Sequence, residues 1–328
     1  MRRKKSPGVL KVLEELLKDT VAGDPVSGLK WTHRSLRKLR KALRRRGIPL
    51  ALATIARLLR DRGFSLKTCR KQRAGIQNPE RDRQFRYIVR MRKLYLAKGL
   101  PVISVDTKKK ELVGNFKNAG RTWRRRPPQV LDHDYPSWAL GQAIPVGIYD
   151  VGANDGYVVV GTSHDTAAFI TAAIRRWWRV VGRRRYPGVR RLLLEMDGGG
   201  ANDPRKWLWK IALQQLADAT GLILVVTHYP PGASKWNPIE HRMFSAISGN
   251  WAGEPLVSYE TIVRYIRTTR TETGFRCRAW LDRKDYPAQR HARPEDKAQV
   301  RLEPHRVLPK WNYTIWPHRS QDHCSSNR

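Results

Sequence analysis

Five short apolar runs constrain the fold of this chain more than any other feature of its sequence. The runs are rich in Val, Ile and Leu and are bounded by turn residues, which predicts buried strands; they span residues 102–106, 144–151, 157–163, 189–200 and 222–228. Helical patterns separate only the later runs, at residues 165–182 and 204–221, and a third follows the last run. The predicted order is therefore β-β-β-α-β-α-β-α.

This order predicts an α/β fold in which three strands of hairpin type precede a strand–helix alternation. It is typical of the ribonuclease-H-like arrangement, a mixed five-stranded sheet with helices on both faces. A doubly wound dinucleotide-binding sheet is the competing fold. The glycines of "DGGG" do not support it, because they follow the fourth strand and do not form G-x-G-x-x-G.

The first 78 residues predict a separate basic, helical region. An amphipathic helix spans residues 9–19 and "AGDPVSG" is a loop; Thr32 then caps a second helix that Gly47 ends. A third helix ends at Gly63, and the second and third helices have helix-turn-helix proportions. Arg57, Arg60 and Arg62 lie on the predicted outer side of the third helix and are candidate DNA contacts. A pair of solvated basic helices is the alternative.

The resulting domain plan has four parts. Residues 1–78 form an all-α helix-turn-helix region, 79–100 a linking helix, 101–275 the ribonuclease-H-like domain, and 276–328 a C-terminal extension.

Charge favours a polyanionic partner. The chain has 65 Lys and Arg against 28 Asp and Glu, a net charge of +37, spread along its whole length. Nucleic acid is the favoured partner, and a ribosomal-type role or an anionic membrane surface are the alternatives. We expect no transmembrane helix and no secretory signal.

The 3 cysteines are widely spaced and form no C-x-x-C, which argues against a disulfide framework or a zinc ribbon and suits a reducing cytoplasm. His318, His323 and Cys324 are interpreted as a polar tail, because no second ligand pair accompanies them.

Three acids stand at the ends of predicted strands in a chain that is poor in acids. Asp106 ends the first strand, Asp197 ends the fourth, and Glu240 opens the helix after the fifth. Neighbouring strand ends lie close together, so the three carboxylates could converge. Because converging carboxylates repel one another, two Mg²⁺ ions are the expected cofactor, with Mn²⁺ as a substitute. Such a pair would support in-line phosphoryl transfer.

Each acid also has a local explanation. Asp106 could cap the turn "DTKKK", and Asp197 could form an Asx-turn before its glycines. Glu240 fits a capping box with Asn237 as N-cap and Pro238 at the first helical position. Acids that could replace one member of the site are Asp134, Asp150 and Glu195.

Basic side chains near the three acids are candidate phosphate contacts. The candidates are Lys108, Lys109, Lys110, Lys235, His241 and Arg242. The lysines could equally be a solvated strand end. His228 could orient water or contact phosphate, or it could be a packed histidine. Ser163, His164 and Asp165 are adjacent in sequence and do not form a hydrolase triad.

Long stretches of the chain resemble a known family, the Rhodopirellula-type DDE transposases of bacterial insertion sequences. The stretches are "PVISVDTKKKELVGNFKNAGRTW", "PVGIYDVGANDGYVVVGTSHDTAAFI", "MDGGGANDPRKWLWKIALQQLADATGL", "PPGASKWNPIEHRMFSAISGNWAG" and "WNYTIWP". The resemblance extends from about residue 20 to 317. It implies a ribonuclease-H-like core whose catalytic triad falls on Asp106, Asp197 and Glu240. The implied reaction is Mg²⁺-dependent cleavage at transposon ends and strand transfer into target DNA, by a homodimer on DNA in the cytoplasm and nucleoid.

The chain also departs from the family pattern. The family usually has a further N-terminal helix-turn-helix region, which this chain is expected to lack. It usually has serine where Ala201 stands, threonine where Ala233 stands and lysine where Pro238 stands. Two alternative functions therefore remain: a DNA-binding remnant without activity, and a ribonuclease-H-like nuclease that cuts without joining.

Overall fold

The computed structural model describes residues 7–18, 21–23, 30–32, 35–64, 79–233, 236–288 and 291–318. The chain divides into two compact units, residues 1–73 and 74–328. Lys235, His323 and Cys324 lie outside the described residues. Within the described ranges, no helix is long and apolar enough to cross a bilayer.

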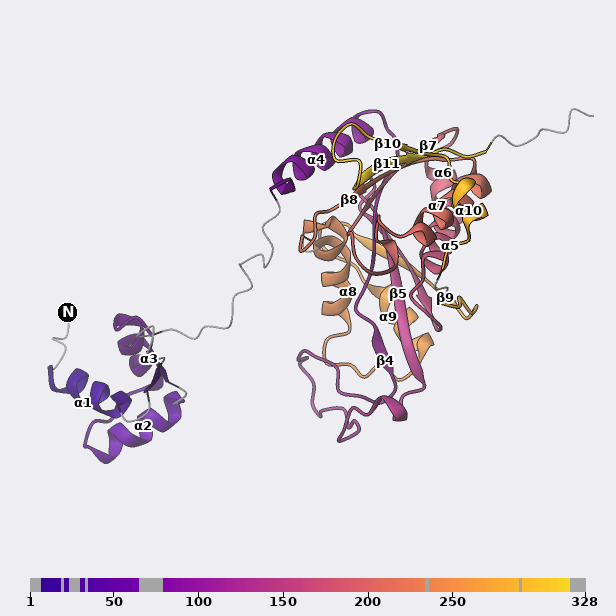
Figure 1. The fold of residues 1–328 in the computed structure, drawn as a ribbon. Coiled ribbons are helices and arrows are strands. Elements are labelled where there is room, and N and C mark those ends of the chain that lie inside the picture. Colours follow the sequence, from indigo (N-terminus) through magenta and orange to yellow (C-terminus); the bar gives the residue numbers. More distant parts are fainter. Residues whose placement is uncertain are drawn as a thin grey trace, which may run out of the picture. The chain divides into compact units, whose positions relative to one another are not determined.

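The described residues of the first unit form three helices and a two-stranded antiparallel sheet (Figure 1). Its elements are α1 (Pro7–Lys18), β1 (Val21–Gly23), β2 (Lys30–Thr32), α2 (Leu36–Arg45) and α3 (Leu52–Asp61). Leucines three or four residues apart give each helix one apolar stripe, and the stripes meet in one small core. Leu13, Leu39, Leu43 and Ile55 are buried there.

Two predictions for this unit are wrong. The region is not all-α, because Val21–Gly23, which includes the start of the predicted loop, pairs as β1 with β2, with Val21 opposite Thr32. Thr32 therefore belongs to a strand and does not cap α2. Ser35 takes that role, since its side chain accepts a hydrogen bond from the backbone N–H of Lys38 at 3.3 Å. Gly47 and Gly63 follow the two helices with positive φ, as predicted.

The second unit is built on one large mixed sheet. Its strands are β3 (Val102–Thr107), β4 (Glu111–Val113), β5 (Gly141–Asp150), β6 (Asp155–Gly161), β7 (Arg191–Met196), β8 (Ile223–His228), β9 (Arg276–Asp282), β10 (Leu302–Pro304) and β11 (Asn312–Ile315). The order across the sheet is β10-β11-β8-β7-β3-β5-β6-β9, and β4 pairs with β5.

The five predicted strands form the centre of this sheet. β5 pairs antiparallel with both β3 and β6. β7 pairs parallel with both β3 and β8. The predicted mixed α/β arrangement is confirmed. The prediction of five strands was incomplete, since β9 joins β6, β11 joins β8, β10 joins β11 and β4 joins β5.

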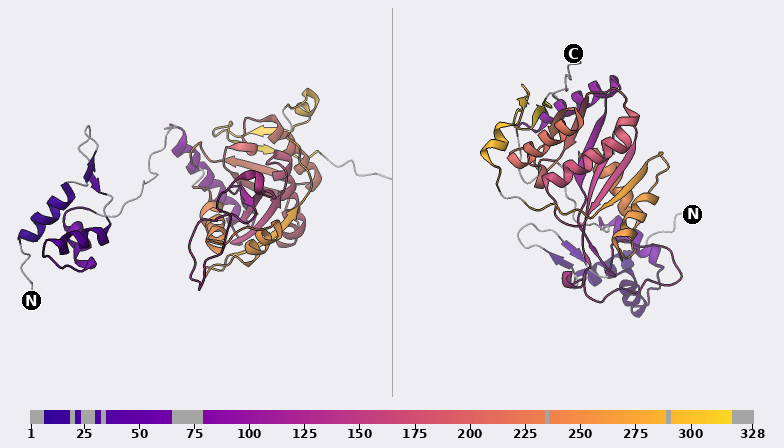
Figure 2. Two further views of the ribbon diagram at one scale, coloured as in Figure 1. Left: turned by 90° about the horizontal axis from the view of Figure 1, so that it is seen from below. Right: turned by 90° about the vertical axis from the view of Figure 1, so that its right-hand side faces the viewer.

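Helices cover both faces of the sheet, as the views in Figures 1 and 2 show. They are α4 (Arg81–Ala97), α5 (Ala167–Trp177), α6 (Arg183–Arg185), α7 (Trp207–Thr220), α8 (Ser245–Asn250), α9 (Tyr259–Thr268) and α10 (Pro294–Ala298). Short 3₁₀ turns lie at η1 (Pro136–Trp138) and η3 (Gly200–Asn202), and π-helical turns at η2 (Trp178–Gly182) and η5 (Glu240–Phe244). α5 and α7 pack on one apolar core, and η5, α8 and α9 pack on another.

The helix predicted as a linker, α4, packs on the sheet through buried polar contacts. The amide of Gln84 donates to the backbone carbonyl of His228 at 2.8 Å and to the side chain of Asn312 at 2.7 Å. Further along α4, the guanidinium of Arg92 donates to Glu195 at 2.8 Å. Because a buried amide or charge is stable only when paired, these contacts fix α4 on the second unit.

Candidate active site

Asp106 lies near the C-terminal end of β3, with its side chain 9% exposed. Side chains alternate along a strand, so Ser104 and Asp106 point to the same face of the sheet. The backbone N–H of Thr107 donates to the Asp106 carboxylate at 2.8 Å. Since β3, β7 and β8 run parallel, their C-terminal ends meet at one edge of the sheet, which we call the catalytic edge.

Asp197 follows β7 at the catalytic edge, and a buried hydrogen-bonded chain holds its backbone. The indole N–H of Trp209 lies 3.0 Å from the Tyr313 hydroxyl, which lies 3.1 Å from Nε2 of His228. Nδ1 of the same imidazole lies 3.1 Å from the backbone carbonyl of Asp197. Because a carbonyl oxygen only accepts, Nδ1–H donates to it; Nε2 of the neutral imidazole then accepts from the Tyr313 hydroxyl, which itself accepts from the indole N–H.

His228 is therefore a packed histidine and not a phosphate contact. It is fully buried, and burial lowers its pKa to about 4, so the imidazole is neutral at neutral pH. A neutral imidazole carries one N–H, which agrees with one accepting and one donating nitrogen. His228 thereby positions the backbone that carries Asp197.

Glu240 is the first residue of the π-helical turn η5. Such turns are rare and occur often at functional sites. The predicted capping box is wrong in its partners. Ser104 donates to the Asn237 side chain and accepts the backbone N–H of Ile239 at 3.2 Å, so a serine of β3 satisfies this helix start. In the described part of the chain no hydrogen bond joins the Glu240 carboxylate to Asn237.

A glycine opposite Asp106 allows η5 to lie close to the sheet. Gly147 of β5 pairs with Asp106 across the two strands. A Cβ atom at Gly147 would lie 2.3 Å from Cε of Met243 and 2.5 Å from the ring of Phe244. A side chain at this position would force the side chains of Met243 and Phe244 on that turn to move.

The three acids affect one another's ionisation. Burial raises the pKa of Asp106 to about 8, with further contributions from the negative charges of Asp197 and Glu240. Burial also raises the pKa of Asp197 and of Glu240, and Asp197 contributes to the shift of Glu240. The negative charges of Asp197 and Glu240 thus act on Asp106, and that of Asp197 acts on Glu240.

The donor chemistry of these acids fits a hard divalent cation, since carboxylate oxygens are its preferred ligands. Among the described residues, however, no group of three or more His, Cys, Asp or Glu side chains is arranged so that it could hold a metal ion.

Comparison with known proteins gives the family. Residues 12–317 match the family described as the Rhodopirellula transposase DDE domain. The chain belongs to this family. The comparison with curated proteins finds no match.

Two solved structures of Mos1 transposase are similar to this DDE transposase. One is the paired-end complex with the left transposon end, at 13% identity and a TM-score of 0.43, over 81% of this chain and 72% of that chain. The other is the mariner paired-end complex with Mn, at 13% identity and a TM-score of 0.44, with the same shares covered.

Asp165 is a fourth acid near the candidate site of the transposase, and the sequence analysis missed it. It accepts a hydrogen bond from the Thr107 hydroxyl at 3.2 Å, and its charge contributes to the raised pKa of Asp106 and of Asp197. The order and direction of the strands could have indicated Asp165. β6 is antiparallel to β5 and hence parallel to β3, so the segment after β6 also reaches the catalytic edge.

The acids considered as replacements lie elsewhere. Asp134 is exposed. Glu195 is fully buried and pairs with Arg92 and the Tyr229 hydroxyl. Asp150 lies beside Ile103, at the opposite end of β3 from Asp106.

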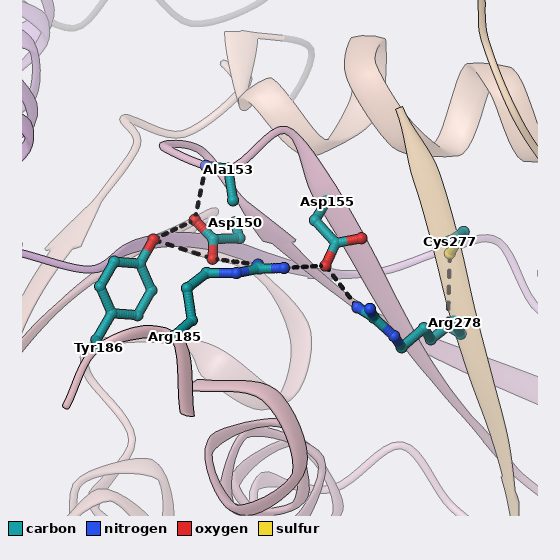
Figure 3. A network of polar contacts seen from close by, with 7 residues as sticks. All are labelled: Asp150, Ala153, Asp155, Arg185, Tyr186, Cys277 and Arg278. Atoms are coloured by element: carbon teal, nitrogen blue, oxygen red, sulfur yellow. Dashed lines mark hydrogen bonds and ion pairs between the residues drawn. The ribbon is translucent and has the colours of Figure 1, made fainter. Parts of the chain in front are cut away.

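Figure 3 shows the ion-pair network that holds Asp150. Its carboxylate accepts from Arg185 at 2.8 Å and from the Tyr186 hydroxyl at 2.8 Å. Arg185 also donates to Asp155, which accepts from Arg278, each at 2.6 Å. The network ties α6 and β9 to the β5–β6 turn, so Asp150 has a structural role.

The candidate DNA contacts near the acids differ in exposure. Lys109, Lys110, His241 and Arg242 are exposed. Lys108 is buried, pairs with Glu111 at 2.8 Å and lies 4.6 Å from the centre of the Trp251 ring. It therefore stabilises the end of β3 and does not present its charge on an open surface.

The candidate DNA contacts of the first unit lie on α3 and just after it. Arg57, Arg60 and Arg62 are exposed, and Arg62 forms an ion pair with Glu14 of α1. An exposed ion pair of this kind is weak.

Proposed function

We propose that this DDE transposase cleaves DNA at the ends of an insertion sequence and joins the freed 3′ end to target DNA. Asp106, Asp197 and Glu240 are its proposed catalytic residues and metal ligands. The observation that carries the proposal is the raised pKa of Asp106, to which burial and the charges of Asp197 and Glu240 contribute. Acids whose pKa values are raised by burial and by one another are typical of catalytic sites.

Divalent cations are the proposed cofactor. Burial raises the pKa of all three carboxyl groups, so the charged form of each lacks full compensation from the protein, and Mg²⁺ prefers such oxygen ligands. When bound, two Mg²⁺ ions, or Mn²⁺ in their place, would activate the attacking hydroxyl and stabilise the leaving oxygen.

The side chains around the acids would bind and orient the DNA backbone. Lys109 and Lys110 are exposed just after β3, and His241 and Arg242 are exposed on η5, so donors follow both Asp106 and Glu240 closely along the chain. Phosphate oxygens accept from such groups, which fixes the position of the strand without reading its sequence. After Asp197 a Cβ atom at Gly199 would lie 3.3 Å from the carboxylate, so glycine keeps this approach open.

The reaction has two steps. In the first, water attacks the phosphodiester at a transposon end and the 3′ oxygen leaves. In the second, that 3′-hydroxyl attacks a target phosphodiester, and one bond forms as another breaks. The same carboxylates would serve both steps, because both are in-line displacements at phosphorus.

The test is a strand-transfer assay with purified protein, Mg²⁺, labelled DNA carrying the ends of the element, and target DNA. The proposal predicts cleaved ends and joined products. Cleavage without joining would instead identify a nuclease, and binding without cleavage would identify an inactive DNA-binding protein.

The first unit is proposed to bind DNA through Arg57 and Arg60 of α3, which are exposed. We further propose a homodimer on DNA and association with the nucleoid through that DNA. Sedimentation of the protein with and without transposon-end DNA tests the dimer.

A further inference from the structure

The segment between β4 and β5, residues 114–140, extends past the catalytic edge (Figure 1). We call it the arm. Gly147 of β5 pairs with Asp106, whereas β5 begins at Gly141, which pairs with Val113 of β4. Six residues of strand correspond to about 20 Å, so the arm starts about that far beyond Asp106.

We propose that the arm binds DNA beside the cleavage point by stacking its exposed aromatic side chains on an unstacked base, with its arginines on the flanking phosphates. The inference rests on the proposed function, since it takes the DNA to lie at the catalytic edge.

Exposed apolar side chains gather on the arm to an unusual degree. Trp123 is 105% exposed, Leu140 72%, Tyr135 50% and Trp138 49%. The ring of Tyr135 stacks on His133 at 5.1 Å and meets Trp138 edge-on at 4.8 Å. None of these side chains joins an apolar core of the described residues. A soluble surface rarely carries such a group of rings without a binding partner.

The charge of the arm favours DNA as its partner. Lys117, Arg121, Arg125 and Arg126 are exposed on it, against two exposed acids, Asp132 and Asp134. Aromatic rings interleaved with arginines match an unstacked nucleotide, which offers a flat base and a negative phosphate. Two copies of the arm would repel each other, because exposed Lys and Arg outnumber the acids on it.

The base of the arm is hydrogen-bonded to the segment that follows α8, and α8 itself follows directly on η5, the turn that carries Glu240. The Asn118 amide donates to the carbonyls of Trp251 at 3.0 Å and Glu254 at 3.2 Å. The N–H of Gly253 donates to the Ala119 carbonyl at 2.8 Å, and Arg124 pairs with Glu254. This attachment sets the distance from the arm to the acids.

The test measures the affinity of the protein for two DNA duplexes, one with a single-nucleotide bulge and one without. EDTA is present, so the result does not depend on cleavage. Wild-type protein should bind the bulged duplex about tenfold more tightly, because its base is already unstacked. Trp123→Ala and Trp138→Ala should lose this preference. Trp123→Tyr should retain it, since it keeps a stacking ring. Trp207→Ala, which removes an exposed tryptophan of α7, is the matched control.

A 2-aminopurine in the bulge reports stacking directly. Its fluorescence should fall when wild-type protein binds and stay high with Trp123→Ala. Equal affinity for both duplexes in wild type and variants would overturn the inference. So would variants that change sedimentation but not DNA binding, because they would identify a second copy as the occupant. Stacking without cleavage in Mg²⁺ would contradict the proposed function alone.

Discussion

At the scale of single residues, the candidate site combines burial with like charge. Burial, Asp197 and Glu240 raise the pKa of Asp106 from 3.8 to about 8. Between those pH values the folded, metal-free protein holds a proton that the unfolded chain has released. Its free energy of unfolding therefore falls as pH rises through this range, and the loss is complete above about pH 8.

We predict that Asp106→Asn removes this pH dependence. In EDTA the variant should be more stable than wild type by about 2–5 kcal/mol at pH 8 and nearly equal to it near pH 4. Urea unfolding at several pH values measures the effect, with Glu272→Gln, an exposed acid, as control. Parallel pH profiles for wild type and Asp106→Asn would contradict the assignment.

The chain from Trp209 through Tyr313 to His228 yields a second prediction. Tyr313→Phe removes the hydroxyl that lies between the indole N–H and Nε2 of His228, leaving both buried groups unpaired. We expect a loss of about 1–3 kcal/mol in stability and slower DNA cleavage, because the Asp197 backbone is then held less firmly. Thermal unfolding and cleavage rates measure these effects, and Tyr265→Phe on α9 is the control. A variant as stable and active as wild type would rule out this role.

At the scale of elements, strands and helices with strong apolar patterns could be predicted, whereas contacts between elements could not. The five central strands are β-branched or leucine-rich runs, and the pattern alone identifies them. β9 alternates buried Cys277 and Ala279 with exposed arginines, so it is less apolar and was missed. Local capping rules placed Asn237 at a helix start, but they could not show that Ser104 of β3 provides the cap.

The candidate acids were found because strand order puts parallel strand ends at one edge. Asp165 was missed because that reasoning was not extended to β6, although the needed information was in the sequence. The burial of Lys108 against Glu111 and Trp251 could not be predicted, because it depends on a tertiary contact.

The packing of η5 on β5 leads to a prediction at this scale. Gly147→Ala should displace the turn that carries Glu240, because the new Cβ would overlap Met243 and Phe244. We expect a loss of about 1–3 kcal/mol in stability and at least a tenfold fall in cleavage rate. Gly249→Ala is the control, since a Cβ there meets no atom within 4 Å. Adding Met243→Ala to Gly147→Ala should restore part of the activity; unchanged activity in Gly147→Ala itself would contradict the argument.

At the scale of the whole molecule, charge dominates. A net charge of +37 on 328 residues predicts DNA binding that weakens steeply with salt. The charge lies on both units, and the exposed Arg57 and Arg60 of α3 belong to the first. Composition could predict a polyanionic partner, but it could not say which surface binds which part of the DNA.

The prediction for this scale concerns salt dependence. Arg57→Ala and Arg60→Ala should each weaken DNA binding and each reduce the slope of log affinity against log salt by about 1. Fluorescence anisotropy across a salt titration measures the slope. Arg293→Ala, whose arginine already pairs with Asp296 at 2.9 Å, should leave it unchanged. Slopes equal to wild type would remove α3 from the DNA interface.

The central claim is that Asp106, Asp197 and Glu240 act as one metal-dependent catalytic site. The most direct measurement is Mg²⁺-dependent cleavage of transposon-end DNA by Asp106→Asn, Asp197→Asn and Glu240→Gln, with Glu272→Gln as control. Each of the three variants should lose at least about 10³-fold in rate while still binding DNA, because each removes one ligand from a shared site. Cleavage near the wild-type rate by any one of the three would contradict the claim.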